Sequence, residues 1–220
     1  MTNISAIALN FNVSQSIDLL LACLAFLFAI LADSWKLFLC TLPLLVLWQW
    51  GPIGKKKATS LTYKIGVLVF AYYLCGIFYL TGIFFSTFRF APYFNFIPFY
   101  HFSSSKWQYL MNTFLFLPLG VLSPLLWKKF QNPIHTIFFG LGVSFFIEVA
   151  QMFFNRLSDV NDLMMNTLGA FIGWCIWFVV SLVWKKSKHI ALSEGNESWS
   201  TICMVSCSAT LVQLLFSRYL

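Results

Sequence analysis

The sequence predicts an all-α membrane protein, a polytopic bundle of about six or seven transmembrane helices with no soluble domain. Sixty percent of its 220 residues are hydrophobic, 10% are charged and 26 are phenylalanine, which is far from the composition of a soluble globular domain. Long apolar runs also recur from one end of the chain to the other. Because these runs leave little sequence between them, no soluble domain is expected.

Apolar runs can be marked along the whole chain. A helix rises about 1.5 Å per residue and the hydrocarbon core is about 30 Å thick, so a run of about 20 residues can span it. The third to sixth runs reach that length. The first two are shorter and form either a tight pair of spans or a shallow hairpin, and the last contains Gln213 and several serines. The runs are 17–32, 37–50, 65–85, 108–127, 134–154, 163–184 and 201–217.

The runs and loops divide the chain into three parts. Residues 1–64 hold the hydrophobic pair and a basic loop, residues 65–184 form a membrane core, and residues 185–220 hold a polar loop and a candidate C-terminal membrane helix. The first residues lack the basic region of a cleavable signal peptide, so the first run is expected to stay in the membrane.

The lysines predict the orientation, because cytoplasmic loops of membrane proteins carry the excess of positive charge. Nine lysines fall on one face of a seven-span arrangement, whereas five basic residues fall on the other. The N-terminus and the lysine-rich loops are therefore predicted to be cytoplasmic, and residues 148–162 to face outward. The nine lysines are Lys55, Lys56, Lys57, Lys64, Lys128, Lys129, Lys185, Lys186 and Lys188.

The composition also argues against several partners. The net charge of +7 does not predict nucleic-acid binding, because the lysines lie in short clusters and form no continuous basic surface. The six cysteines fall inside apolar segments without metal-ligand spacing, and the three histidines stand far apart. The sequence therefore predicts neither a metal site nor another cofactor.

Polar residues are concentrated in the stretch 148–173, between two apolar runs. This stretch contains three of the seven carboxylates, and ionisable groups at membrane depth are costly unless they have a partner, a water-filled cavity or a function. Glu148 lies about 9 Å inside the end of its run, at about 1.5 Å per residue. Small and polar residues recur on the same helix face at spacings of three and four: Gly140, Ser144, Glu148, Gln151 and Asn155.

The sixth run carries a matching face with Asn166 and a Gly169–Gly173 pair. Small residues let helices approach closely, so this face is predicted to pack on the Glu148 face. Asn161 and Asp162 suit the helix N-terminus, where short polar side chains accept backbone N–H groups.

The fourth run adds Asn112, followed by Pro118 and Gly120, which can bend or open a helix. Pro92 and Pro98 argue against a regular helix in the loop before it. Together these elements predict an outward-facing ligand-binding pocket, without an assigned catalytic residue or metal ligand. Its residues are Asn112, Glu148, Gln151, Arg156, Asp159, Asp162 and Asn166.

These polar residues also have a structural explanation. Asn112 and Asn166 can tie helices together through hydrogen bonds of about 0.6 kcal/mol each. Arg156 can form a surface ion pair with the aspartates, worth about 0–1 kcal/mol. Glu148 is harder to explain in this way, because a buried unpaired carboxylate must take up a proton or find a cation.

The ordered set of motifs resembles the VanZ-like family of integral membrane proteins over residues 65–184. The matching residues are Asn95-Phe96-Ile97-Pro98-Phe99, Asn112, Phe116-Leu117-Pro118-Leu119-Gly120, Ser144, Glu148, Gln151, Arg156, Asp159, Asp162, Asn166, Gly169 and Gly173. Phe96 stands where an aliphatic residue is expected, and the segments outside 65–184 are not shared. The resemblance implies a multi-pass protein of the bacterial cytoplasmic membrane, in a family named for low-level resistance to teicoplanin-type glycopeptides.

Three functions are compatible with these features. The favoured hypothesis is a non-enzymatic protein whose pocket binds an envelope lipid, a lipid-linked envelope precursor or a lipoglycopeptide. The second is an enzyme acting on a lipid-linked substrate with Glu148 or Asp159 as general base, or with Mg²⁺ or Ca²⁺ held by Glu148, Asp159 and Asp162. The third is a proton-coupled transporter or scramblase in which Glu148 carries the proton.

Overall fold

The computed structural model describes residues 21, 28, 34–47, 49, 60–81, 90, 93–99, 102–153, 158–183 and 207. Its long elements are helices α2 (Leu61–Leu80), α3 (Phe102–Leu126), α4 (Pro133–Met152) and α5 (Val160–Val183). A 3-10 turn η2 (Lys128–Gln131) joins α3 to α4, and two short strands, β1 (Phe94–Asn95) and β2 (Ser158–Asp159), precede α3 and α5. A shorter apolar helix, Ser34–Leu47, lies before α2.

The third to sixth apolar runs are confirmed as long helices. Four helices are long and apolar enough to cross a membrane, and they correspond to α2, residues Lys106–Leu126 of α3, α4 and α5. The described residues therefore support a helical membrane protein with four candidate spans, fewer than the predicted six or seven. The runs 17–32 and 201–217 lie outside the described residues apart from single positions.

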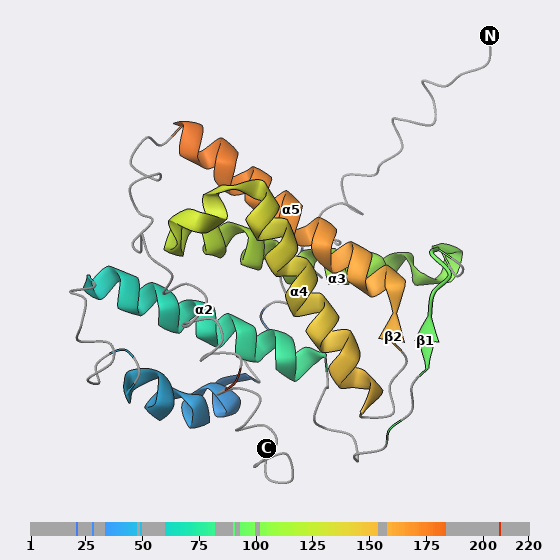
Figure 1. Ribbon diagram of the computed structural model, residues 1–220, viewed down its shortest axis with the longest axis horizontal. Coiled ribbons are helices and arrows are strands. Elements are labelled where there is room, and N and C mark those ends of the chain that lie inside the picture. The colour runs from blue at the N-terminus through green and yellow to red at the C-terminus, as the bar shows by residue number, and fades with distance from the viewer. Residues whose placement is uncertain are drawn as a thin grey trace.

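The four long helices alternate in direction (Figure 1). At one end of the bundle α2 and α4 finish and α3 and α5 begin, and we call this the site end. At the opposite end lie Lys64, Lys128 and Lys129, and we call this the lysine end. Two helix starts at the lysine end are capped, because Ser60 Oγ accepts from Tyr63 N at 3.2 Å and Asn132 Oδ1 accepts from Ile134 N at 3.0 Å.

The most extensive contact between helices joins α3 to α5, which run parallel. A Cβ on Gly169 would overlap the Thr113 carbonyl oxygen, and a Cβ on Gly173 would overlap that of Leu117. The predicted partner of this face was therefore wrong for its glycines, since Gly169 and Gly173 pack on the α3 backbone, but right for Asn166, whose Nδ2 donates to Ser144 Oγ of the Glu148 face. The glycines pack on α3 because that helix also offers a small residue, Gly120, on which a Cβ would overlap the Ala170 carbonyl oxygen.

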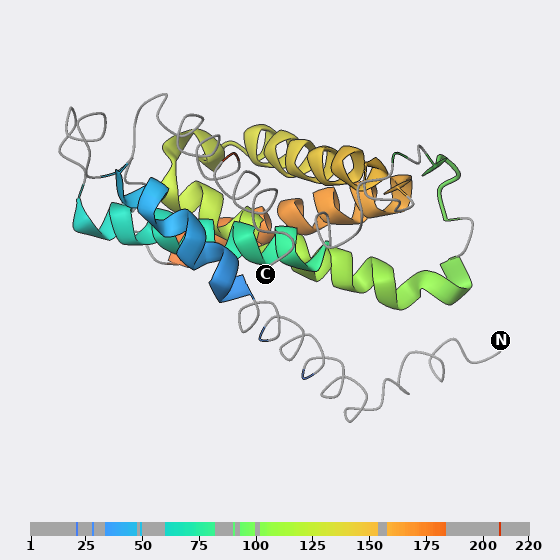
Figure 2. The ribbon, with the colours of Figure 1, turned by 90° about the horizontal axis from the view of Figure 1, so that it is seen from below.

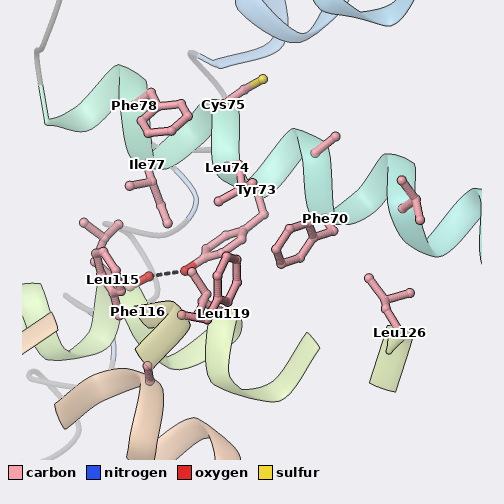
Figure 3. Packing of buried hydrophobic residues seen from close by; sticks show 14 of the residues in the cluster. Phe70, Tyr73, Leu74, Cys75, Ile77, Phe78, Leu115, Phe116, Leu119 and Leu126 are labelled. Carbon is pink, nitrogen blue, oxygen red and sulfur yellow. Dashed lines mark hydrogen bonds between the residues drawn. The ribbon is translucent and has the colours of Figure 1, made fainter. Parts of the chain in front are cut away.

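A second contact surface between α2 and α3 is apolar and fully buried (Figure 3). Phe70, Leu74 and Phe116 are 0% exposed, and the Tyr73 hydroxyl donates to the Leu115 carbonyl within this cluster. Trp127 is also part of this core, at 1% exposure, and its Nε1 donates to Tyr63 Oη at 3.0 Å. Burial between helices supplies the dispersion contacts that hold a membrane bundle together.

The two strands pair in parallel at the site end, Phe94 with Ser158 and Asn95 with Asp159. Figures 1 and 2 show β1 and β2 beside the starts of α3 and α5. As Pro92 and Pro98 predicted, the described residues 93–99 are not helical. We call residues 93–99 the hook. The pairing satisfies backbone groups where neither segment is helical, a requirement that is strict near a membrane.

Candidate functional site

Glu148 lies in the last turn of α4 and is 2% exposed. Its position follows from the predicted face, since Gly140, Ser144, Glu148 and Gln151 are all buried. The Glu148 carboxylate is hydrogen-bonded to the backbone: its Oε2 accepts from the N–H of Asp159 at 2.9 Å. The Glu148 carbonyl oxygen accepts from Ser158 Oγ at 2.7 Å. Glu148 therefore fastens strand β2 to the end of α4.

Asp159 is a helix cap. It immediately precedes α5, and its Oδ1 accepts from the backbone N–H of Asn161 at 2.9 Å, which satisfies a donor that the helix leaves unpaired. The same oxygen accepts from Asn161 Nδ2 at 2.8 Å. Asn161 and Asp162 lie in the first turn of α5, as predicted, but the side chain that caps the helix is that of Asp159, because α5 begins earlier, at Val160, than its apolar run.

The other oxygen of Asp159 connects α5 to the hook. Asp159 Oδ2 accepts from Asn95 Nδ2 at 3.3 Å, and Asn95 Oδ1 accepts from Ile97 N at 3.1 Å. Asn161 adds a second connection, since its Oδ1 accepts from Phe99 N at 2.8 Å. Both Asp159 oxygens are thus occupied by protein donors, so Asp159 is suited to positioning the hook.

Two further predicted residues tie helix ends together. Asp162 accepts from Gln108 Nε2, at 3.0 Å to Oδ1 and 3.3 Å to Oδ2, which joins the starts of α3 and α5. Gln151 Nε2 donates to the Thr81 carbonyl at 3.0 Å, which joins the ends of α2 and α4. Gln151 therefore faces α2, away from the Asp162 contact.

Asn166 and Asn112 each have a hydrogen-bonding atom that no described residue pairs with. Asn166 is 3% exposed, and its Nδ2 donates to Ser144 Oγ at 2.9 Å across the α4–α5 contact. Within the described part of the chain, its Oδ1 is buried without a hydrogen-bond partner, as is Nδ2 of Asn112 on α3. Asn112 directly precedes Thr113, whose carbonyl oxygen lies against Gly169, and Asn166 lies three residues before Gly169 on α5.

The structure thus brings most of the predicted residues to one end of the bundle without joining them in one network. Glu148 and Asp159 are linked by a hydrogen bond and Asp162 is linked to Gln108, whereas Asn112 and Asn166 each keep an atom without a partner among the described residues; Arg156 lies outside the described residues. The predicted site set omitted the linking residues Asn95, Gln108, Ser158 and Asn161. The sequence signal for Asn95 was the residue type itself. An asparagine side-chain oxygen can close a turn by accepting from the backbone N–H two residues later, which here is Ile97.

The divalent-metal form of the enzyme hypothesis needs Glu148, Asp159 and Asp162 to lie together. Among the described residues, no group of three or more His, Cys, Asp and Glu side chains is arranged to hold a metal ion. The Asp159 oxygens are directed to Asn95 and Asn161 instead.

Four apolar helices in alternating directions, with a hydrogen-bonded polar network at one end, define a polytopic helical membrane protein. Residues 70–181, half of the chain, match the family model described as VanZ/LLP1. The chain belongs to the VanZ/LLP1 family, as the resemblance predicted. Searches of the curated proteins and of the solved structures found no match.

Proposed function

We propose that the protein binds the polar head group of an envelope lipid, or of another membrane amphiphile, at the site end of α3, α4 and α5. The observation that carries this proposal is that two buried amide atoms, Nδ2 of Asn112 and Oδ1 of Asn166, have no hydrogen-bond partner among the residues that the structure describes. A buried polar atom without a partner costs about 1–3 kcal/mol, so a ligand that supplies the missing partners would recover that energy.

The depth of the two asparagines fits a lipid head group. Each lies six residues inside its apolar helix, counted from Lys106 in α3 and from Val160 in α5. At about 1.5 Å per residue this is about 9 Å below the start of each apolar segment. A head group at the interface is within reach of that level, whereas a solute that stays in water is not.

The chemistry of the pair favours a hydroxyl-bearing head group. Asn112 offers a donor and Asn166 offers an acceptor, and a hydroxyl group can accept from the first and donate to the second. Glycerol and sugar head groups carry several hydroxyls. Glu148 and Asp159 then act as positioning residues, and Arg156 is expected to contact an anionic part of the ligand.

A thermal-shift experiment with defined lipids tests this proposal. The purified protein in detergent is mixed with dioleoyl phosphatidylglycerol, which has head-group hydroxyls, or with dioleoyl phosphatidylcholine, which has none. Phosphatidylglycerol is expected to raise the Tm of the wild type more, and Asn112→Leu and Asn166→Leu are expected to lose the difference. Thr167→Val is the control, because the Thr167 hydroxyl donates within its own helix to the Leu163 carbonyl. Equal shifts for both lipids in the wild type would contradict the proposal.

The proposal extends to low-level protection against teicoplanin-type glycopeptides, which are amphiphiles. Cells that express the wild type or Asn112→Leu at matched membrane levels would be compared for susceptibility to teicoplanin and vancomycin. Protection by the wild type that the variant lacks is the expected result. If neither protein protects, the resistance part is wrong, and the lipid experiment decides the rest.

A further inference from the structure

In the hook, backbone polar groups are hydrogen-bonded to the protein, whereas large side chains are exposed. Its Tyr93 carbonyl and its Ile97 and Phe99 N–H groups make hydrogen bonds to the protein, two of them to Asn95 and Asn161 side chains. Its large side chains are exposed instead: Phe96 is 74%, Tyr93 68% and Ile97 57% accessible. An exposed apolar cluster of this kind marks an interaction surface.

The hook has a fixed shape. Phe99 has a φ of 59°, in the left-handed region that bulky residues seldom adopt. Such a conformation persists where the surroundings enforce it, and here Asn161 Oδ1 holds the Phe99 N–H at 2.8 Å. The exposed side chains are therefore presented on a rigid frame.

Two aromatic contacts show where the hook lies along the long axis of the bundle. The ring of Phe99 meets that of Tyr109 edge to face, with centroids 6.1 Å apart. Tyr109 lies three residues inside the apolar segment that begins at Lys106, or about 4.5 Å at 1.5 Å per residue. Beside the hook, Phe90 packs on Phe153, the residue that directly follows α4, at 5.2 Å. Through Phe99, the hook therefore lies against the first turns of α3.

We infer that the hook is a lipid-seated anchor, in which Tyr93, Phe96 and Ile97 insert among the lipids of the leaflet at the site end while Asp159 and Asn161 hold its position. Lipid is the occupant that fits, because the hook is level with the first turns of apolar helices and Trp107, near the start of α3, is 51% exposed at the same level. Amphipathic aromatic side chains favour that zone of a bilayer. The inference concerns the hook alone and does not require a ligand at Asn112 and Asn166.

Photo-cross-linking in liposomes of phosphatidylglycerol and phosphatidylethanolamine tests the inference. p-Benzoylphenylalanine would replace Phe96, with Phe138 as the lipid-facing reference because it is 66% exposed in the second turn of the apolar helix α4. Lys129, an exposed residue of the η2 turn outside the long helices, is the reference for a polar end. Lipid-mass adducts at position 96 are expected at a yield within about threefold of those at 138 and above those at 129.

A second position guards against a local effect of the substitution. The same replacement at Tyr93 is expected to give lipid adducts too, provided that each variant elutes as a single species in size-exclusion chromatography. Yields at both 96 and 93 no higher than at 129 would overturn the inference. The phosphatidylglycerol thermal shift is a separate readout, so failure of the head-group proposal would leave this result interpretable.

Discussion

The backbone N–H of Asp159 donates to Glu148 Oε2 at 2.9 Å, so the strand that leads into α5 is hydrogen-bonded to a buried carboxylate on α4. The bond gives Glu148 a structural reason to be buried at this depth. It also places Asp159 where its two oxygens cap α5 and hold Asn95 of the hook. Glu148 thus holds β2 at the end of α4, and Asp159 in turn holds the hook beside the start of α5.

The role of Glu148 as an acceptor can be tested by comparing Glu148→Gln with Glu148→Leu. Glutamine keeps a carbonyl oxygen for the Asp159 N–H, whereas leucine leaves that buried donor without its partner, at a cost of about 1–3 kcal/mol. We expect the Tm in detergent to fall clearly more for the leucine variant. Equal loss in both variants would show that the negative charge, and not the acceptor, is required.

The cap of α5 predicts a graded response at Asp159. Asp159→Ala removes the acceptor for the Asn161 N–H, and losing a cap costs about 0.5–2 kcal/mol of unfolding free energy. Asp159→Asn retains an oxygen acceptor and is expected to lose less. Thermal unfolding measures both, and an alanine variant as stable as the wild type would argue against the cap.

Asn161→Ala is expected to loosen the hook, because Phe99 N would lose its partner. Amide hydrogen exchange of a peptide covering residues 93–99 should become at least about tenfold faster, which corresponds to about 1.4 kcal/mol of lost protection. Peptides from the middle of α4 serve as the internal control and should exchange as before. Unchanged exchange in the hook would mean that Asn161 does not hold it.

The parallel contact of α3 and α5 predicts that Gly169 tolerates no side chain. A Cβ there would overlap the Thr113 carbonyl oxygen, so Gly169→Ala should force the helices apart and cost about 1–3 kcal/mol. Gly142→Ala is the matched control, because Gly142 is exposed in α4 and a Cβ there meets no described residue within 4 Å. Thermal unfolding should show loss for Gly169→Ala and no loss for Gly142→Ala; similar losses would contradict the close contact.

The buried hydrogen bond between Trp127 and Tyr63, near the lysine end, can be tested by substitution. Tyr63→Phe removes the oxygen that accepts from Trp127 Nε1 and leaves a buried donor unpaired, which should lower the unfolding free energy by about 1–3 kcal/mol. Tyr93→Phe removes a hydroxyl from a side chain that is 68% exposed and should change stability little. A Tyr63→Phe variant as stable as Tyr93→Phe would show that the Trp127 bond contributes nothing.

The sequence alone determined the class of protein, the four long helices and the buried face of α4. Each of these depends on a local pattern: run length against the thickness of the hydrocarbon, and polar residues repeating every three or four positions. Trp127 shows where such a pattern fails. Its place at the end of an apolar run predicts an interfacial residue, yet it is 1% exposed because Tyr63 of α2 receives its N–H.

Tertiary structure decided which face meets which. The sequence shows that Gly169 and Gly173 form a small-residue face, but a small-residue face fits any helix that comes close, and only the folded chain selects α3 over α4. The pairing of Asn95 with Asp159 was equally inaccessible, because 64 positions separate them and a hydrogen bond depends on distance and direction in space. Helix formation is local and leaves a periodic signature in the sequence, whereas the partners of buried polar groups are fixed only when distant segments pack together.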